Sequence, residues 1–218
     1  KSQDKLYYEY KDGKRLKDPD DNDKPKPIKR PFFNPKKVDK LKNSNVTPID
    51  WILDYFDNPK NQILLLDAKT GTGKSTIVPD ALLRKYSQKL GERKIICTQP
   101  RRLTAQLISN RVKEQLKDSK SYNSLAKLVG YKVKDDTNVD PQKTKMIYMT
   151  EGTLSKILLD NPDEFDKYEF IIIDEVHERN VETDLLLWLI KTNIRDHPNL
   201  KVIITSATFD IKQFIKYF

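Results

Sequence analysis

The sequence has 218 residues, of which 37% are hydrophobic and 33% charged, a balance typical of a soluble globular protein. Its formal net charge of +9 favours an anionic partner, with nucleic acid as the first candidate. The single cysteine, Cys97, excludes an internal disulfide, and its apolar run 94–98 predicts a buried strand thiol. No apolar run approaches the ~20 residues of a membrane span, and the lysine-rich start lacks the apolar core of a signal peptide. We therefore expect a soluble, intracellular protein, in the nucleus, the cytoplasm or a viral compartment. We also expect it to be a monomer.

Residues 1–46 are predicted to form a polar, basic arm, because they are rich in charges and turn formers. This segment contains 14 Lys and Arg against 8 Asp and Glu, so the arm carries most of the net positive charge. Its aromatic residues could stack on single-stranded nucleic acid, but we favour packing against the globular part. These residues are Tyr7, Tyr8, Tyr10, Phe32 and Phe33.

Residues 47–218 alternate predicted helices and strands. Thr47 and Pro48 suit the cap and first position of a helix. Several later runs are apolar without polar alternation, which favours a mostly parallel sheet with helices on both faces, an α/β fold. The predicted strands are 62–67, 94–98, 128–134, 145–150, 170–173 and 202–205. Helices are predicted from residue 49, from near residue 75, and over 101–116, 151–159 and 185–194, whereas 135–142 are predicted to be turns.

A glycine-rich loop separates the strand 62–67 from the next helix. Gly71 and Gly73 allow backbone angles that a Cβ would forbid, so successive N–H groups can surround an anion at a helix N-terminus. The pattern predicts a nucleotide site in which Lys74 binds the β and γ phosphates and Ser75 ligates Mg²⁺. Ala68 stands where this pattern has its first glycine. The local loop conformation can therefore differ from the usual one, whereas phosphate binding is still expected. The expected nucleotide-binding residues are Ala68, Lys69, Thr70, Gly71, Thr72, Gly73, Lys74, Ser75 and Thr76.

Two acids follow the apolar strand 170–173. At the carboxyl end of a strand, Asp174 can hold Mg²⁺ through its water shell, and Glu175 can orient the water that attacks the γ-phosphate. With Lys74, these two acids are the predicted catalytic residues, and Ser75 and Asp174 are the predicted metal ligands.

The run from Asp174 to Arg179 reads Asp-Glu-Val-His-Glu-Arg and resembles the second motif of the DEAH-box (DEAH/RHA) branch of superfamily 2 helicases, with Val176 in place of alanine. The segments 98–102, 150–154 and 206–208 resemble motifs Ia, Ib and III of that family, in the same order. The resemblance covers residues 49–218. It implies the first RecA-like P-loop domain of an ATP-dependent RNA helicase, with ATP and Mg²⁺ as cofactors. Residues 47–218 would form this domain.

The resemblance also implies roles for individual residues. The nucleic-acid backbone would be contacted by Arg101, Arg102, Thr150 and Thr153. Arg111 would stack on the adenine. Coupling to a second RecA-like domain, outside this sequence, would involve His177, Arg179, Ser206 and Thr208. Because that second domain supplies arginine fingers in the family, we expect the 218-residue chain by itself to bind nucleotide but to hydrolyse it slowly.

Two alternatives remain open. Ala68 and the missing half of the motor are compatible with a nucleic-acid-binding module whose nucleotide site is degenerate. A P-loop ATPase acting on DNA or protein is the other alternative, against which Arg101, Arg102 and the ordered motifs argue. Val176 also occurs in related viral helicases, and with the composition rich in Lys, Asn and Ile it hints at a viral source.

Overall fold

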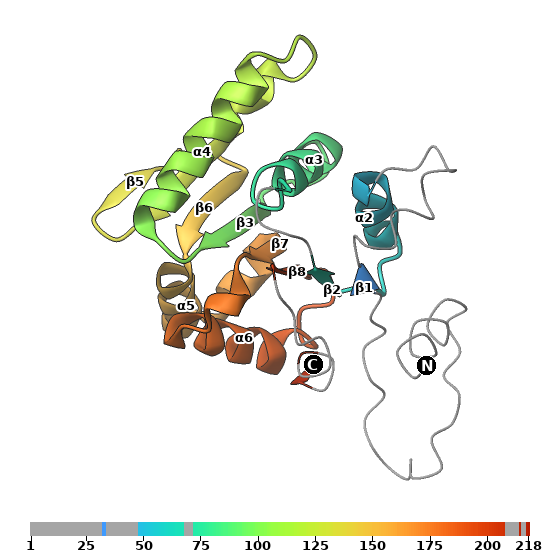
Figure 1. Cartoon of the computed structure of the whole chain (residues 1–218), viewed down its shortest axis with the longest axis vertical. Helices are drawn as coiled ribbons and strands as arrows, with labels where there is room; N and C mark the ends of the chain where they lie inside the picture. Colours follow the sequence, from blue (N-terminus) through green and yellow to red (C-terminus); the bar gives the residue numbers. More distant parts are fainter. Residues whose placement is uncertain (1–31, 34–47, 68–71, 208–213, 215–216) are drawn as a thin grey trace.

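Eight strands form one sheet within the residues that the computed structural model describes, which are 32–33, 48–67, 72–207, 214 and 217–218. Their order across the sheet is β1-β2-β8-β7-β3-β6-β4-β5 (Figure 1). Every neighbouring pair is parallel except β4 and β5. The strands are β1 Phe32–Phe33, β2 Ile63–Asp67, β3 Lys94–Gln99, β4 Val129–Val133, β5 Asp136–Asn138, β6 Met146–Thr150, β7 Tyr168–Ile173 and β8 Lys201–Ser206.

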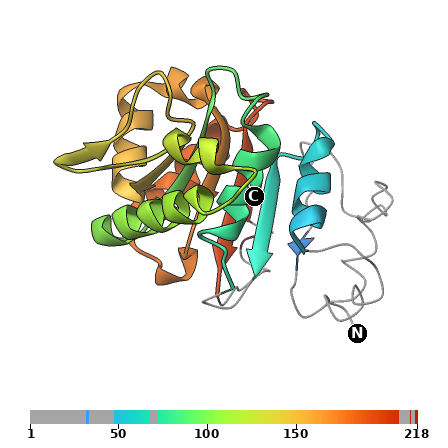
Figure 2. The same ribbon diagram turned by 90° about the horizontal axis from the view of Figure 1, so that it is seen from above.

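Helices cover both faces of this sheet (Figures 1 and 2). One face carries α2 Pro48–Asp57, α3 Ile77–Tyr86 and α4 Arg102–Lys117, and the other carries α5 Glu151–Asp160 and α6 Val181–Asn193. Short 3₁₀ segments connect them: η2 Asn123–Leu128, η3 Pro162–Lys167 and η4 Val176–Glu178. None of the helices in the described part of the chain combines the length and apolarity that crossing a bilayer needs.

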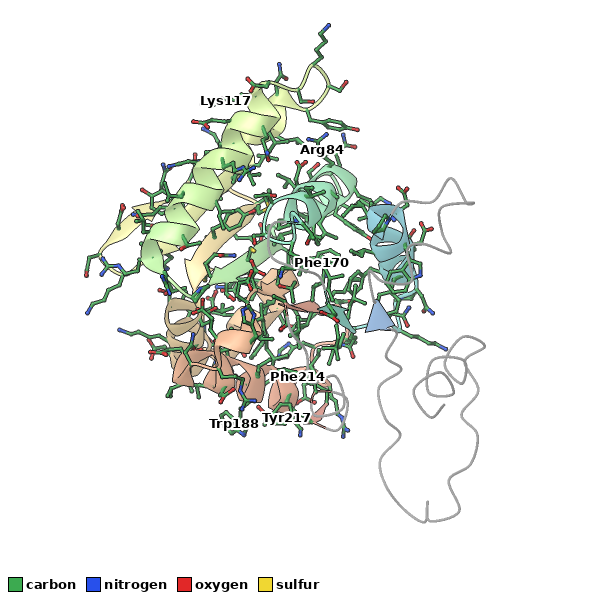
Figure 3. All side chains as sticks on the ribbon, viewed as in Figure 1. Arg84, Lys117, Phe170, Trp188, Phe214 and Tyr217 are labelled. Atoms are coloured by element: carbon green, nitrogen blue, oxygen red, sulfur yellow. The ribbon has the colours of Figure 1, made fainter. Side chains whose placement is uncertain are left out.

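Successive strand residues enter two different cores, which explains why the strands are apolar without alternation. In β2, Leu64 and Leu66 belong to the core on the side of α2, α3 and α4, whereas Ile63 and Leu65 belong to the core on the side of α5 and α6. Phe170 of β7 lies in the first core (Figure 3), where its ring centroid is 5.4 Å from that of Phe56.

The α/β class and the mostly parallel sheet predicted from the sequence are confirmed. Cys97 is buried in β3, as expected, and burial raises the pKa of its thiol well above the usual value. The prediction of turns over residues 135–142 was wrong in part, because β5 pairs there with β4 as a hairpin. Its three residues are polar and exposed, so no hydrophobic pattern marked it as a strand.

Two helices begin at residues other than those predicted, and one part of the predicted arm forms a strand. The helix expected from near residue 75 begins at Ile77, because residues 74–76 form a turn. The helix expected from residue 185 begins at Val181, where Asn180 Oδ1 accepts the backbone N–H of Thr183. In the predicted arm, Phe32 and Phe33 form a parallel pairing with Leu65 and Leu66; the remaining arm residues lie outside the described ranges.

Strand order determines which residues meet at the carboxyl edge of the sheet. Residues after parallel strands gather at one edge, where α/β domains usually bind ligands. The register pairs Asp67 with Ser206 and Gln99 with Thr150, and β7 ends beside β8 and β3. Segments that are distant in the sequence therefore lie together at this edge.

Candidate functional site

The turn after β2 places Lys74 at the start of α3. Gly73 has φ +86, and an added Cβ would lie 2.4 Å from Ile77 Cδ1, so only glycine fits this position without rearrangement. The Gly73 carbonyl accepts the N–H groups of Thr76 and Ile77, which closes the turn. Thr76, the N-cap of α3, makes no side-chain cap bond. An uncapped helix start directly after a tight glycine turn presents N–H groups suited to an anion.

Asp174 is the centre of a hydrogen-bond network at the end of β7, and only 1% of it is exposed. Its Oδ2 accepts Ser75 Oγ–H and, at 2.8 Å, Gln99 Nε2–H. Its Oδ1 accepts Thr205 Oγ1–H and, at 3.0 Å, the backbone N–H of Glu175. Four donors from four segments thus fix this carboxylate beside Ser75, where burial without partners would be costly.

Glu175 turns away from the strand direction, because its backbone adopts a left-handed conformation with φ 55. Such angles are rare for residues other than glycine, asparagine and aspartate, and they cluster at functional sites. In this orientation Glu175 Oε1 lies 3.5 Å from Nζ of Lys74, which is 4% exposed. Glu175 Oε2 lies 3.2 Å from His177 Nδ1. One carboxylate therefore contacts both the lysine of the glycine turn and the histidine of η4.

His177 connects this group to the end of β8. The backbone N of Ala207 is 3.5 Å from His177 Nδ1, a longer contact than that to Glu175. Ser206 is buried at the end of β8, while Thr208 lies outside the described residues. Arg179 is exposed and its Nε lies 3.5 Å from Asp184 Oδ1 on α6. The structure thus brings His177 to the acids and points Arg179 toward α6.

The residues expected to contact nucleic acid lie at the starts of α4 and α5. Arg101 is the exposed N-cap of α4, and Arg102 is exposed with its Nη2 3.8 Å from Asp135 Oδ2. The hydroxyl of Thr150 caps α5 by accepting the backbone N–H of Thr153, and the two threonine hydroxyls are 2.8 Å apart. Because β3 and β6 are neighbours, these two helix starts are adjacent.

Other expected site residues are not joined to this group. Arg111 is exposed on α4, and no interaction found among the described residues connects it to Lys74 or Asp174. Ala68, Lys69, Thr70 and Gly71 lie outside the described ranges. Thr72 is exposed beside Gly73.

Three contacts of the site were not predicted from the sequence. Gln99 and Thr205 donate to Asp174, and Tyr148 OH donates to the Ser75 carbonyl at 2.9 Å. Gln99 ends an apolar strand, and Thr205 precedes Ser206, so a polar residue at a strand end was the available signal. Tyr148 gave no such signal, because it lies in the middle of β6, where it is fully buried, and not at a strand end.

The donor set suits a magnesium-bound nucleotide. Mg²⁺ is usually held by one or two protein oxygens, several waters and substrate phosphates. Ser75 Oγ and Asp174 Oδ2 provide two adjacent oxygens, and Lys74 provides a buried cation for phosphate. Among the residues that the structure describes, no group of three or more His, Cys, Asp or Glu could hold a metal ion by itself.

The fold and this edge define an α/β domain of the RecA-like class. A model of the family described as DEAD/DEAH box helicase matches residues 52–216, and the chain belongs to this family. It is also similar to the crystal structure of the Escherichia coli DEAH/RHA helicase HrpB, with 29% sequence identity and a TM-score of 0.64. That match covers 82% of this chain and 21% of HrpB, so the chain spans about a fifth of that helicase's length.

Proposed function

We propose that this chain is the first RecA-like domain of an ATP-dependent RNA helicase of the DEAH/RHA branch, with residues 1–46 as an appended basic arm. The observation that carries the proposal is the meeting of Lys74, Asp174 and Glu175 at the carboxyl edge of the sheet. These side chains come from segments about a hundred residues apart, since Ser75 and Asp174 are separated by 99 positions. The family membership and the likeness to HrpB support the same function.

In this proposal residues 68–76 surround the phosphates, with Lys74 neutralising the β and γ phosphates. Ser75 and Asp174 hold Mg²⁺, and Asp174 does so partly through water. When bound, Mg²⁺ neutralises charge on the phosphate oxygens. Gln99 and Thr205 keep the Asp174 carboxylate in place. Arg111 is proposed to stack on the adenine.

Glu175 is proposed to orient the attacking water and to accept its proton. Replacing Glu175 by glutamine keeps the side-chain shape but removes the acceptor of a proton. General bases typically contribute 10²–10⁴-fold, so single-turnover ATP hydrolysis by Glu175→Gln should fall by on the order of a hundredfold, with Mg-ADP affinity changed less than about threefold. Rapid-quench measurement of radiolabelled phosphate release tests this.

Glu178→Gln is the matched control for that experiment, because Glu178 is an exposed acid three residues later in η4. It should keep the wild-type hydrolysis rate. Equal rates for wild type and Glu175→Gln would remove Glu175 from the proposed chemistry while leaving nucleotide binding intact.

Nucleic-acid binding is proposed to involve Arg101, Arg102, Thr150 and Thr153, which would contact phosphates without reading bases. Arg101 is the sharpest test because it is exposed and caps α4 with no side-chain cap bond. Arg101→Ala should weaken binding of a labelled oligouridylate about five- to tenfold and lower the salt slope of log Kd by about one. Fluorescence anisotropy over a series of KCl concentrations measures both quantities.

The control for this variant is Arg195→Ala, which removes an exposed arginine beyond the C-terminal end of α6. It removes the same net charge, so a general electrostatic effect would appear in both variants. A salt slope that is the same in Arg101→Ala and Arg195→Ala would contradict a phosphate contact by Arg101.

The contact of His177 with both Glu175 and Ala207 supports a role in coupling. We propose that His177, Arg179, Ser206 and Thr208 transmit the state of the nucleotide site to a second RecA-like domain of the whole helicase.

A further inference from the structure

Glu151 is a buried acid that the proposed chemistry does not use. It is the first residue of α5 and only 2% exposed. Its Oε1 accepts the hydroxyl of Thr98, 3.5 Å away at the end of β3. Thr98 lies three positions before Arg101, and Thr150 directly precedes Glu151. The Glu151 carboxyl therefore connects the two segments that are proposed to contact nucleic acid.

The surroundings of this carboxyl contain further acids. Glu151 belongs to none of the ion pairs found in the described part of the chain. Asp174 from the end of β7 and Glu178 from η4 act on it electrostatically, and Glu182 of α6 lies beside the adjacent Gly152. Its own backbone N–H and the Thr98 hydroxyl favour the charged form. Burial outweighs them, and the repulsion of Asp174 and Glu178 adds to it, so the pKa of Glu151 is raised to about 7.

A purely structural role at the helix start accounts poorly for this arrangement. An acid in the first turn stabilises a helix when it is charged, because it faces the positive end of the helix dipole. Thr150 already caps α5 through Thr153, and a buried carboxyl whose charged form is disfavoured contributes little of this stabilisation. Its contact across to β3 calls for another explanation.

We propose that Glu151 is a positioning residue for nucleic-acid binding, which holds the Thr98–Arg102 segment against the Thr150–Thr153 cap through its contact with Thr98. The inference rests on the proposed function, since it assigns Glu151 to the same nucleic-acid edge. Neutral Glu151 adds no negative charge to this edge. Charged Glu151 places a carboxylate one residue from Thr150 and repels a nearby phosphate.

The direction of the pH dependence follows from the raised pKa. Below pH 7 most Glu151 is protonated and affinity for a phosphate backbone is highest; as the pH rises through 7 the carboxylate forms and affinity falls. One negative charge on Glu151 near a bound phosphate corresponds to about a three- to tenfold change in Kd. The contribution of Glu151 is isolated by comparison with a variant that carries no titratable proton at this position.

Anisotropy titration of the 218-residue chain with fluorescein-labelled oligouridylate, from pH 6.0 to 8.0 at constant ionic strength, tests the inference. Wild type should lose about three- to tenfold in affinity across this range. Glu151→Gln, neutral and of the same shape, should keep its pH 6.0 affinity at pH 8.0. The matched control is Glu182→Gln, an exposed acid on α6, which should keep the wild-type pH dependence.

Thr98→Val provides a second variant, because it removes the hydroxyl donor and keeps the branched shape. It should weaken oligouridylate binding severalfold at pH 6.0 with an unchanged circular-dichroism melting curve and unchanged Mg-ADP affinity. Parallel pH profiles for wild type and Glu151→Gln, or full affinity in Thr98→Val, would overturn the positioning role while nucleic-acid binding stands. Absence of oligouridylate binding by wild type at every pH would instead overturn the proposed nucleic-acid function, and this inference with it.

Discussion

Replacing Lys74 by alanine is expected to weaken Mg-ADP binding by at least about a hundredfold. Lys74 is buried and lies 3.5 Å from Glu175, so its loss removes the buried cation at the proposed phosphate position. Charge-assisted hydrogen bonds contribute about 1.5–3 kcal/mol each, and 1.4 kcal/mol corresponds to a tenfold change in affinity. Isothermal titration calorimetry of wild type and Lys74→Ala measures the difference.

Lys89→Ala is the control, since Lys89 is an exposed lysine in the segment after α3. It should bind Mg-ADP like wild type. If wild type fails to bind Mg-ADP, or if Lys74→Ala binds it equally well, the degenerate-site alternative would be favoured. In that case the glycine turn would be a structural feature of a nucleic-acid-binding module.

The second large effect is expected from Asp174→Asn. The amide has one acceptor oxygen, whereas both oxygens of Asp174 accept two donors each. An NH₂ group must therefore face donors on one side, which should lower the free energy of unfolding by about 2 kcal/mol. The loss of the carboxylate charge should also abolish the Mg²⁺ dependence of nucleotide affinity.

Two measurements separate these consequences. Urea unfolding in EDTA gives the stability loss without metal, and calorimetric titration with ADP in the presence and absence of Mg²⁺ gives the metal dependence. Asp160→Asn, at the exposed end of α5, should leave both quantities unchanged. Retention of wild-type Mg²⁺ dependence in Asp174→Asn would exclude Asp174 as a metal ligand.

The gathering of Lys74, Ser75 and Asp174 could be predicted because each follows an apolar strand, and parallel strands end at the same edge. The support of Asp174 by Gln99 and Thr205 could not be predicted in the same way. It requires β7 to lie between β3 and β8, and strand order is not encoded in any local pattern. The left-handed backbone of Glu175, which turns this residue toward Lys74, gave no sequence signal either, since glutamate rarely adopts it.

Polar contacts between residues distant in the sequence could not be predicted either. The exposed hairpin of β4 and β5 brings Asp135 to within 3.8 Å of Arg102, which was expected to contact nucleic acid. Both side chains are exposed, so this pair contributes little to stability. A phosphate could therefore replace Asp135 as the partner of Arg102 at small cost.

The distance along the chain between Ser75 and Asp174 also has a thermodynamic consequence. Their contact spans 99 residues and Gln99 meets Asp174 across 75, so no fragment of the sheet contains the complete site. A ligand held there can bind only molecules in which β2, β8, β7 and β3 are assembled. Nucleotide should accordingly protect amide protons of these central strands, as well as those of the glycine turn, from hydrogen exchange, by an amount that grows with ligand concentration.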